Sequence, residues 1–176
     1  MKKLSMDALG RIDAAAFRDA EKTPFVVVYD NVRSALNVGS AFRTADSFRL
    51  AEVVLCGITA QPPHKEIFKT ALGATETVNW RYFDDTVTGL QALRAEGYEI
   101  WAVEQVENST MLHNFAVNCS KKYAFVFGNE VEGVSEAALA CCDGCIEIPQ
   151  IGAKHSLNIS VCTGIVVWEA FRQYYG

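Results

Sequence analysis

The sequence predicts a single α/β domain in which a parallel sheet is covered by helices on both faces. Its 176 residues, 50% of them hydrophobic, are enough for one compact domain with a sizeable core. Short apolar runs rich in β-branched residues alternate with stretches of helical periodicity. This alternation is typical of right-handed crossovers between parallel strands. No internal repeat, low-complexity run or interdomain linker interrupts the pattern.

The predicted elements follow one another in a regular order. Residues 25–30, FVVVYD, are continuously β-branched and aromatic, which is typical of a strand buried on both faces. In the helix predicted at 37–48, apolar residues recur at helical spacing from Val38 to Phe48. Further strands are predicted at residues 51–57, 76–83, 98–105, 122–128 and 145–149. Further helices are predicted at residues 64–72, 86–97, 135–142 and 157–175, with a short helical piece at 109–115.

Residues 1–22 are predicted to form a helical extension ahead of a main domain that spans residues 23–176. Apolar residues recur there at helical spacing, and the opposite face of the expected helix is polar. A Thr-Pro pair follows the extension and ends it, because proline does not continue a helix. The apolar stripe consists of Leu4, Ala8, Ile12 and Ala15 or Ala16.

The overall charge argues against nucleic-acid binding through bulk attraction. The formal net charge is −5 at pH 7, from 21 acidic and 16 basic residues. Phosphate binding depends on where lysines and arginines cluster, so a local basic strip is compatible with this charge. The N-terminus lacks the apolar region of a signal peptide, and no apolar run approaches the roughly 18 residues that span a bilayer. We expect a cytoplasmic protein without membrane association.

The six cysteines are expected to be structural. In a reducing compartment, cysteines mostly serve as small core residues. Cys142 and Cys145 form a C-x-x-C pair, but no second pair and no suitably spaced histidine completes a zinc site. The sequence therefore predicts no metal centre.

Polar loops follow several of the predicted strands, at the edge of the sheet where open α/β folds bind ligands. In the first loop, Asn37 lies at a helix N-cap position, and Gly39 permits a close approach. Arg43 falls off the apolar stripe, and this pattern by itself also fits a capped helix with a solvated arginine. In the second loop, the strand ends at Gly128, Glu130 follows, and a second glycine turns the chain into a helix.

The third loop precedes the final helix. Pro149 ends the last strand, and Gly152 permits a backbone path that other residues resist. Ser156 is expected to cap the final helix and Asn158 to lie in its first turn, where backbone N–H groups lack partners and face whatever the loop encloses. A fourth loop, EQVENSTML at residues 104–112, offers carboxylates and an amide after a strand.

Three sequence blocks together resemble the motifs of the SpoU (TrmH-like) branch of the SPOUT RNA methyltransferases. The blocks are NVGSAFR at 37–43, FGNEVEGVS at 127–135 and IPQIGAKHSLNISV at 148–161, and the third is the most diagnostic. The resemblance spans residues 25–172, with the order and spacing of that family. It implies an α/β domain with a deep C-terminal trefoil knot and S-adenosyl-L-methionine as the methyl donor. The implied reaction is methyl transfer to a ribose 2′-hydroxyl of tRNA or rRNA.

The resemblance also implies which residues hold the donor. By residue match, the main chain of Gly128, Ile148 and Leu157 is expected to contact S-adenosyl-L-methionine. The loop that begins near Val103 and Glu104 is expected to add to the pocket, although the match there is looser.

The implied catalytic residues come from all three blocks. Arg43 matches the catalytic arginine of the family, which is thought to act on the 2′-hydroxyl with help from an RNA phosphate. A guanidinium is a poor base, so we expect Arg43 to orient the nucleophile and to bind phosphate. Asn37 is expected to hold the first loop and Glu130 to organise the second. Ser156 and Asn158 are expected to fix the third loop near donor and acceptor.

Members of this family are generally homodimers in which catalytic residues meet across the interface. The final predicted helix fits such an assembly, because it is apolar on more than one face. The expected RNA contacts are Arg33, Arg43 and Lys154, with Lys65, Lys69 and Arg81 as further candidates for phosphate contacts.

Two other functions remain open on the sequence. A Rossmann-like nucleotide-binding enzyme needs a glycine-rich turn after the first strand, and NVRSALNVG at 31–39 does not supply it. A non-catalytic RNA-binding module of the same fold would be expected to have lost Arg43, Glu130 or the S-L-N triplet, and all of these are present.

Overall fold

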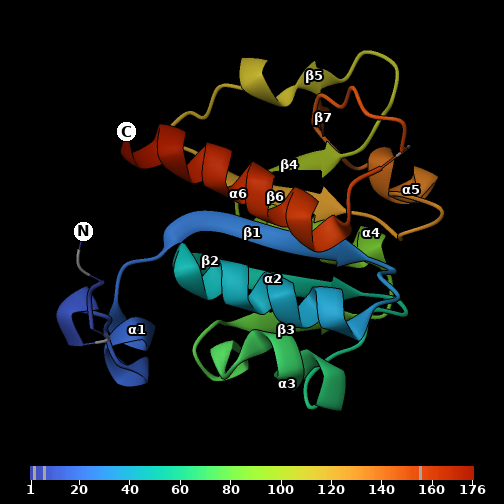
Figure 1. The fold of residues 1–176 in the computed structure, drawn as a ribbon. Coiled ribbons are helices and arrows are strands. Elements are labelled where there is room, and N and C mark those ends of the chain that lie inside the picture. Colours follow the sequence, from blue (N-terminus) through green and yellow to red (C-terminus); the bar gives the residue numbers. More distant parts are fainter. Residues whose placement is uncertain (2, 6, 155) are drawn as a thin grey trace.

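One parallel sheet organises the protein. The computed structural model describes residues 1, 3–5, 7–154 and 156–176. Within these residues, seven strands form a single sheet in the order β3-β2-β1-β6-β4-β7-β5, and every pairing between them is parallel (Figure 1). The predicted parallel sheet is confirmed. The strands are β1 (Thr23–Asp30), β2 (Leu50–Cys56), β3 (Trp80–Phe83), β4 (Tyr98–Val103), β5 (Thr110–Met111), β6 (Lys122–Phe127) and β7 (Gly144–Glu147).

Helices cover both faces of this sheet, as predicted. On one face α2 packs against α6, and α3 lies on the other side of α2 (Figure 1). On the opposite face lie α4 and α5, over a separate apolar core. The helices are α1 (Ala14–Asp19), α2 (Ala35–Ser47), α3 (Lys65–Ala71), α4 (Thr86–Ala95), α5 (Glu136–Leu139) and α6 (Ile159–Tyr175).

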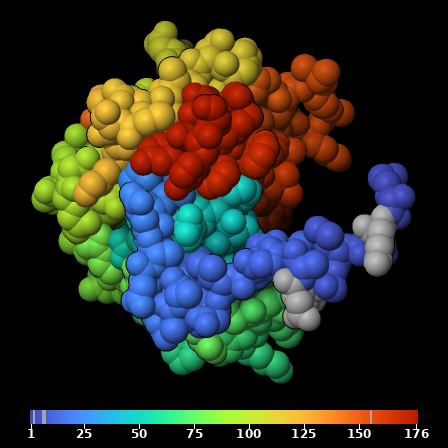
Figure 2. All heavy atoms as spheres, turned by 90° about the vertical axis from the view of Figure 1, so that its left-hand side faces the viewer, coloured from blue at the N-terminus to red at the C-terminus, as the bar shows by residue number. Residues whose placement is uncertain are grey.

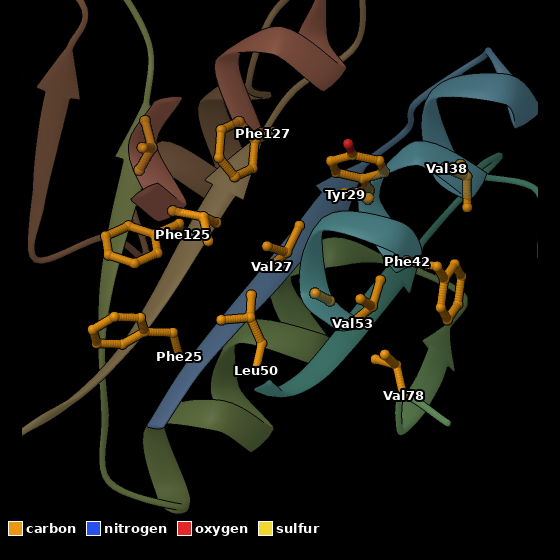
Figure 3. Close-up of a cluster of buried hydrophobic side chains, with 14 of the residues drawn as sticks. Phe25, Val27, Tyr29, Val38, Phe42, Leu50, Val53, Val78, Phe125 and Phe127 are labelled. Carbon is orange, nitrogen blue, oxygen red and sulfur yellow. The ribbon is translucent and has the colours of Figure 1, made fainter. Parts of the chain in front are cut away.

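Strand β1 is buried on both faces because its side chains alternate between two cores. Phe25, Val27 and Tyr29 point toward α2 and α6, where the cluster includes Val38 and Phe42 (Figure 3). The alternate residues of the strand belong to the core under α4 and α5. Each large apolar side chain buried in this way contributes about 1.5–3 kcal/mol relative to exposure. The continuous apolar run at 25–30 therefore behaves as its pattern predicts.

The strand register brings several loops to one edge of the sheet. Tyr29 of β1 and Val103 of β4 both pair with Phe127 at the end of β6. Val103 also pairs with Ile146 of β7. The chain segments that leave β1, β4, β6 and β7 therefore start from neighbouring positions. This edge is where the sequence predicts the functional loops.

The N-terminal segment departs from the predicted helix. A 3-10 turn at Asp7–Leu9 and the short α1 replace one long helix, and Gly10, with φ of 60°, lies between them. Leu4 and Ile12 are 69% and 49% exposed, so the predicted apolar stripe does not pack against a core. In Figure 2 the described residues 3–5, in dark blue, stand out from the body of the protein. The boundary between an extension and a main domain at residue 23 stays a prediction.

Two further elements differ from the sequence pattern. The segment 109–115, predicted as a helical piece, contains the edge strand β5 and then a 3-10 turn at Leu112–Asn114. A strand of two residues has no detectable period, which explains why the pattern misses it. The strand predicted at 76–83 is shorter, because residues Ala74–Glu76 form another 3-10 turn before β3. The predicted trefoil knot stays a prediction, since strand order and contacts do not trace how the chain passes through its own loops.

Candidate active site

A cavity of about 530 Å³ opens at the carboxyl ends of β4, β6 and β7. The loops after these strands and the first turn of α6 form its wall, and we call it the main cavity. The structure brings seven of the predicted site residues together here. They are Val103, Glu104, Gly128, Glu130, Ile148, Ser156 and Leu157.

Glu130 joins the second sequence block to the first. Its carboxylate accepts backbone hydrogen bonds from the N–H groups of Arg33 and Ser34 at 2.9 and 3.0 Å. It also accepts one from the side-chain amide of Asn37 at 3.0 Å. Charge-assisted hydrogen bonds of this kind are stronger than neutral ones. Glu130 therefore holds the loop after β1 against the loop after β6. Its organising role in the reaction stays a prediction.

Asn37 is not the helix cap that the sequence predicts. Helix α2 starts two residues earlier, and Ser34 caps it by accepting the N–H of Asn37 at 3.3 Å. The Asn37 side chain is buried and lies between the other two blocks. It donates to Glu130, and its oxygen accepts from Asn158 Nδ2 at 3.3 Å. Asn37 thereby links all three sequence blocks through two hydrogen bonds.

The predicted cap of the final helix is wrong as well, in this case by two residues. Asn158 caps α6, because its side-chain oxygen accepts the N–H of Ser160 at 2.9 Å and the hydroxyl of Ser160 at 2.6 Å. Ser156 is exposed and lines the main cavity instead. One amide side chain thus starts α6 with its oxygen and reaches Asn37 with its nitrogen.

The carboxylate of Glu104 shapes the cavity wall. It accepts the backbone N–H of Gln105 at 2.8 Å and that of Val134 at 3.0 Å. Gly133 has φ of 71°, and a Cβ at this position would lie 2.3 Å from Glu104 Oε2. Any side chain there would displace the carboxylate. The predicted cavity residue Glu104 thus holds the loop after β6 through Oε2, while Oε1 accepts a hydrogen bond from Gln105, the next residue of its own loop.

Gly128 permits that same loop to close on itself. Asn129 and Gly133 exchange two backbone hydrogen bonds of 2.9 Å each. A Cβ at position 128 would lie 2.0 Å from the carbonyl carbon of Gly133, which is closer than any packed contact. The glycine is therefore required by the tight turn, and the turn places backbone groups at the cavity.

Sequence reasoning misses one buried carboxylate that supports this arrangement. Asp30, at the end of β1, is 1% exposed. Its Oδ2 accepts the backbone N–H of Ser135 at 2.8 Å, at the start of α5. Its Oδ1 accepts from the hydroxyl of Thr86, at the start of α4. An acidic residue at the end of a buried strand is the signal by which it could have been found.

The individual apolar side chains of the cavity wall were not among the residues predicted for the site. These side chains come from the ends of β6 and β7, from the loop after β6, and from α5 and α6. Polar sequence motifs do not point to them. Apolar walls with few directed polar groups are typical of small-molecule sites. The apolar residues that line the cavity beside the predicted ones are Phe127, Val131, Val134, Leu139, Ile146, Ile159 and Cys162.

Arg43 lies in a different hollow. Its side chain is exposed on α2, and it lines a space of about 470 Å³ where α2, α3 and α6 meet. We call this space the α2–α3 hollow. The structure does not bring Arg43 into the main cavity within one chain. The residues of the hollow are Ser40, Arg43, Thr44, Ser47, Phe48, Lys69, Thr70 and Gly164.

The other two predicted RNA contacts are also outside the main cavity. Arg33 is exposed, and its backbone N–H, not its guanidinium, bonds Glu130. Lys154 is exposed in the loop before α6. Neither side chain takes part in an ion pair among the described residues. Both cations are therefore available to solvent.

The electrostatics of Glu130 follow from its hydrogen bonds. Burial by itself raises the pKa of this carboxyl group, but backbone N–H groups, first that of Arg33, and the Asn37 amide outweigh it. The net effect holds the pKa of Glu130 below its ordinary value. The group is therefore charged at neutral pH, which strengthens its hold on the first loop. Elsewhere in the cavity wall, burial raises the pKa of the Cys162 thiol.

Two negative observations concern the described residues only. Across 1, 3–5, 7–154 and 156–176, no three His, Cys, Asp or Glu side chains gather as a metal ion would require. In the same part of the chain, helices fall short of the length and apolarity needed to cross a bilayer.

The strand order separates this fold from the dinucleotide-binding alternative. After β3, β2 and β1 the order continues with β6, β4 and β7, which departs from the order of the Rossmann fold. The sequence model of the SpoU rRNA Methylase family matches residues 24–168. The chain belongs to the SpoU family. The resemblance of the three sequence blocks is thereby confirmed, and the Rossmann-like interpretation is set aside.

Several curated SpoU-family proteins are similar over most of the chain. The 23S rRNA (guanosine-2′-O-)-methyltransferase RlmB of Vibrio parahaemolyticus is 31% identical over 153 residues, covering 86% of this chain and 60% of that protein. The tRNA (guanosine(18)-2′-O)-methyltransferase of Thermus thermophilus is 32% identical over 147 residues, covering 84% of this chain and 74% of that protein. The chain thus spans about 60% of the length of the RlmB relatives.

Solved structures of the SpoU family share the fold. The TrmH/SpoU tRNA modifying enzyme of A. aeolicus superposes with a TM-score of 0.78 at 28% identity, covering 92% of this chain and 80% of that one. The AdoMet-bound rRNA methyltransferase of Sinorhizobium meliloti gives a TM-score of 0.78 at 27% identity, covering 89% and 59%. The predicted fold class is confirmed by these likenesses.

Proposed function

We propose that this protein transfers a methyl group from S-adenosyl-L-methionine to a ribose 2′-hydroxyl of RNA. The observation that carries the proposal is the link between Glu130, Asn37 and Asn158, one residue from each sequence block, at the border of the main cavity. Family membership supports the same conclusion, as do relatives named as rRNA and tRNA 2′-O-methyltransferases.

The main cavity fits the proposed donor. Its apolar strand ends suit a nucleoside, and the tight turn at Gly128 offers backbone groups for directed hydrogen bonds. We assign the donor contacts to the main chain of Gly128, Ile148 and Leu157, with Val103 and Glu104 completing the wall. A cationic ligand also suits the glutamates of this cavity. These are Glu104, Glu130, Glu132 and Glu147.

The chemistry needs little from the protein beyond positioning. When bound, the donor supplies a methyl group that a sulfonium has already activated. We assign Ser156 and Asn158 to holding the third loop at the cavity mouth: Ser156 lines the cavity, and Asn158 caps α6. Asn37 and Glu130 fix the first and second loops relative to it. Positioning of this kind lowers a barrier by holding the reacting groups at the correct distance.

We assign Arg43 to the RNA side of the reaction. Its guanidinium has a planar fork of N–H donors, which matches a phosphate and can also orient a hydroxyl group. Among the described residues it has no ion-pair partner, so its charge is not used within the chain. Because Arg43 and the main cavity are separate within one chain, the proposal requires a second copy.

We therefore propose a homodimer in which Arg43 of one protomer faces the main cavity of its partner. Helix α6 supports this, because Val161 and Trp168 are 48% and 51% exposed. Gly164 lies between them at helical spacing and has open space around it, so another helix could approach closely. This apolar face also borders the α2–α3 hollow that holds Arg43.

The RNA substrate is tRNA or rRNA in this proposal, with Arg33, Arg43 and Lys154 contacting phosphates. Both types occur among the named relatives. Because such RNA is found in the cytoplasm, we place the activity there. We propose that no metal ion takes part, because transfer from a sulfonium needs no Lewis acid. We also propose that the reaction does not involve a membrane.

The test is a transfer assay on total RNA. The purified protein is incubated with S-adenosyl-L-methionine labelled in its methyl group, and the RNA is digested to nucleosides for mass spectrometry. The proposal expects label in nucleosides methylated on the ribose. Label on a base would contradict it. Donor binding by calorimetry without any transfer would instead favour a non-catalytic RNA-binding module.

A further inference from the structure

The outer face of α3 combines exposed apolar and basic side chains. Helix α3 buries Ile67 and Ala71 against the rest of the protein. On the opposite side, Phe68 is 47% exposed and Leu72 is 65% exposed. Lys65 lies about one turn before Phe68 and Lys69 directly follows it, and both lysines are exposed. We call Lys65, Phe68, Lys69 and Leu72 the α3 face.

The α3 face continues into the α2–α3 hollow. Lys69 belongs to both, because it lines the hollow together with Arg43. Hydroxyl groups of Ser40, Thr44 and Ser47 line the same space, and no residue of the hollow is acidic. The main cavity, in contrast, is lined by glutamates. An anion would be attracted to the hollow and repelled from the cavity.

The cations of this region are not used elsewhere in the protein. Among the described residues, the basic side chains in ion pairs are those of Arg81, Arg94, Lys121 and Arg172. Arg43, Lys65 and Lys69 are outside these pairs. In a chain with a net charge of −5, Lys65 and Lys69 on the α3 face, with Arg43 in the adjoining hollow, form a local basic region.

We propose that the α3 face and the α2–α3 hollow bind an unpaired stretch of the substrate RNA. Phe68 stacks on a base, and Lys69 contacts a phosphate beside the one bound by Arg43. Single-stranded nucleic acid is commonly held in this way, by an aromatic platform for the bases and cations along the backbone. The inference rests on the proposed function, since it names how the substrate of that reaction is held.

A second copy of the chain is a poorer occupant of this face. In a two-fold dimer the interface is formed by the same surface patch of both subunits. Pairing of the α3 face with itself would bring Lys65 and Lys69 of both protomers together, and like charges repel. The exposed apolar face of α6, with Val161 and Trp168, has no such lysines.

The inference is tested by binding of RNA to the full protein without donor. The probes are a short single-stranded oligoadenylate and a duplex RNA of the same length, measured by fluorescence anisotropy. We expect Phe68→Leu to weaken oligoadenylate binding about 5-fold or more, because leucine keeps the apolar surface but does not stack. Phe68→Tyr should restore it. Duplex binding should be weaker in the wild type and insensitive to Phe68.

The phosphate contact has its own matched control. Lys69→Gln should reduce the slope of log affinity against log salt by about 0.7, the value for one phosphate contact on a single strand. Lys121 is also exposed but precedes β6, at the other end of the sheet, and is paired with Glu99. Lys121→Gln should leave the slope unchanged. An equal effect of both substitutions would mean that only bulk charge matters and would overturn the inference.

Other outcomes also decide the matter. Oligoadenylate binding by Phe68→Leu at wild-type strength would overturn the inference. Dissociation of an oligomer by the same substitution, seen in light scattering, would also overturn it, because the α3 face would then be a protein interface. The KM for RNA should rise in Phe68→Leu and Lys69→Gln while donor affinity stays the same. If wild type methylates no RNA, the proposed function fails by itself, and oligoadenylate binding still tests the α3 face.

Discussion

The side-chain nitrogen of Asn158 donates a hydrogen bond to the side-chain oxygen of Asn37 at 3.3 Å, across 121 positions of sequence. The nitrogen of the same Asn37 amide donates to Glu130. The start of α6 is thereby fixed to α2 and to the loop after β6. Each of the three polar residues has a partner in another sequence block, so the loss of one loosens the whole border of the main cavity.

The first prediction separates this link from the helix cap. Asn158→Asp keeps the oxygen that caps α6 but removes the nitrogen that reaches Asn37. Asn158→Ala removes both and should lose about 1 kcal/mol of stability through the cap alone. We expect both variants to bind the donor more weakly and to transfer methyl groups slowly. Calorimetry and thermal unfolding measure the two effects separately.

The control for this pair is Asn114→Ala, since Asn114 is an exposed asparagine outside the site. It should retain wild-type donor affinity. Wild-type donor affinity in Asn158→Asp would show that the hydrogen bond to Asn37 does not hold the cavity.

The second prediction concerns acid stability. Because the pKa of Glu130 is lowered in the folded protein, its contribution is present at neutral pH and is lost as pH falls through the ordinary carboxyl range. Glu130→Gln should therefore lose part of the steep fall in Tm between about pH 5 and about pH 3. Tm is measured across this range in wild type, Glu130→Gln and Glu132→Gln.

Glu132 is the matched control, because its side chain is exposed two residues away. Glu132→Gln should follow the wild-type curve. Parallel curves for wild type and Glu130→Gln would mean that the hydrogen bonds of Glu130 do not stabilise the fold.

The third prediction concerns the homodimer. Val161→Asp should shift the protein from dimer to monomer in light scattering, since a carboxylate buried without a partner costs several kcal/mol. Val161 is more suitable than Ile165, which packs partly against the core. Trp168→Asp should act in the same direction, but Trp168 also packs against Phe48 and Phe171. Ile58→Asp, at another exposed apolar position, is the control.

A mixing experiment tests whether Arg43 acts across the interface. Arg43→Ala and Asn158→Ala proteins, each expected to be slow alone, should regain activity when they are unfolded and refolded together. A mixed dimer then contains one intact combination of Arg43 and main cavity. An inactive mixture with proven mixed dimers would place both residues in the same protomer's site.

The fourth prediction concerns the cysteines. Burial raises the pKa of Cys56 and Cys142 to about 12, so neither forms much thiolate at neutral pH. Iodoacetamide should label the exposed Cys119 first and these two only after unfolding. Peptide mass spectrometry follows the labelling. Rapid labelling of Cys142, or stoichiometric zinc that leaves together with donor affinity on chelation, would contradict a structural role.

The strongly patterned elements could be predicted from the sequence. The apolar run of β1 and the stripe of α2 depend on burial, which a period reveals directly. The short helical piece predicted at 109–115 is confirmed in part by the 3-10 turn at Leu112–Asn114. The edge strand β5 was missed because it depends on its neighbour β7, not on its own composition. The N-terminal stripe failed because periodicity alone does not supply a surface to pack against.

For the candidate site, the sequence pointed to residues that the structure brings together, but it did not predict their hydrogen bonds or which of them cap helices. The three sequence blocks identify Asn37, Glu130 and Asn158, and the structure brings them together. The caps were misplaced because Ser34 and Asn37 are both good capping residues, as are Ser156 and Asn158. Ser34 caps α2, while the Asn37 side chain bonds Glu130, ninety-three positions away in the sequence. No local pattern contains that contact.

The separation of Arg43 from the main cavity could not be predicted from the sequence. Arg43 lies six residues after Asn37 on helix α2. At this spacing its side chain leaves another side of the helix and lines the α2–α3 hollow. Whether the two sites cooperate depends on a second copy of the chain.

The central claim is that Arg43 positions a ribose hydroxyl for methyl transfer, and single-turnover transfer to RNA tests it most directly. Wild type, Arg43→Ala and Arg43→Lys are compared, with donor affinity measured for each by calorimetry. We expect both variants to bind the donor normally and to transfer at least about 100-fold more slowly, because an ammonium keeps the charge but not the planar fork. Wild-type turnover by Arg43→Lys would contradict the account and leave Arg43 as a solvated residue of α2.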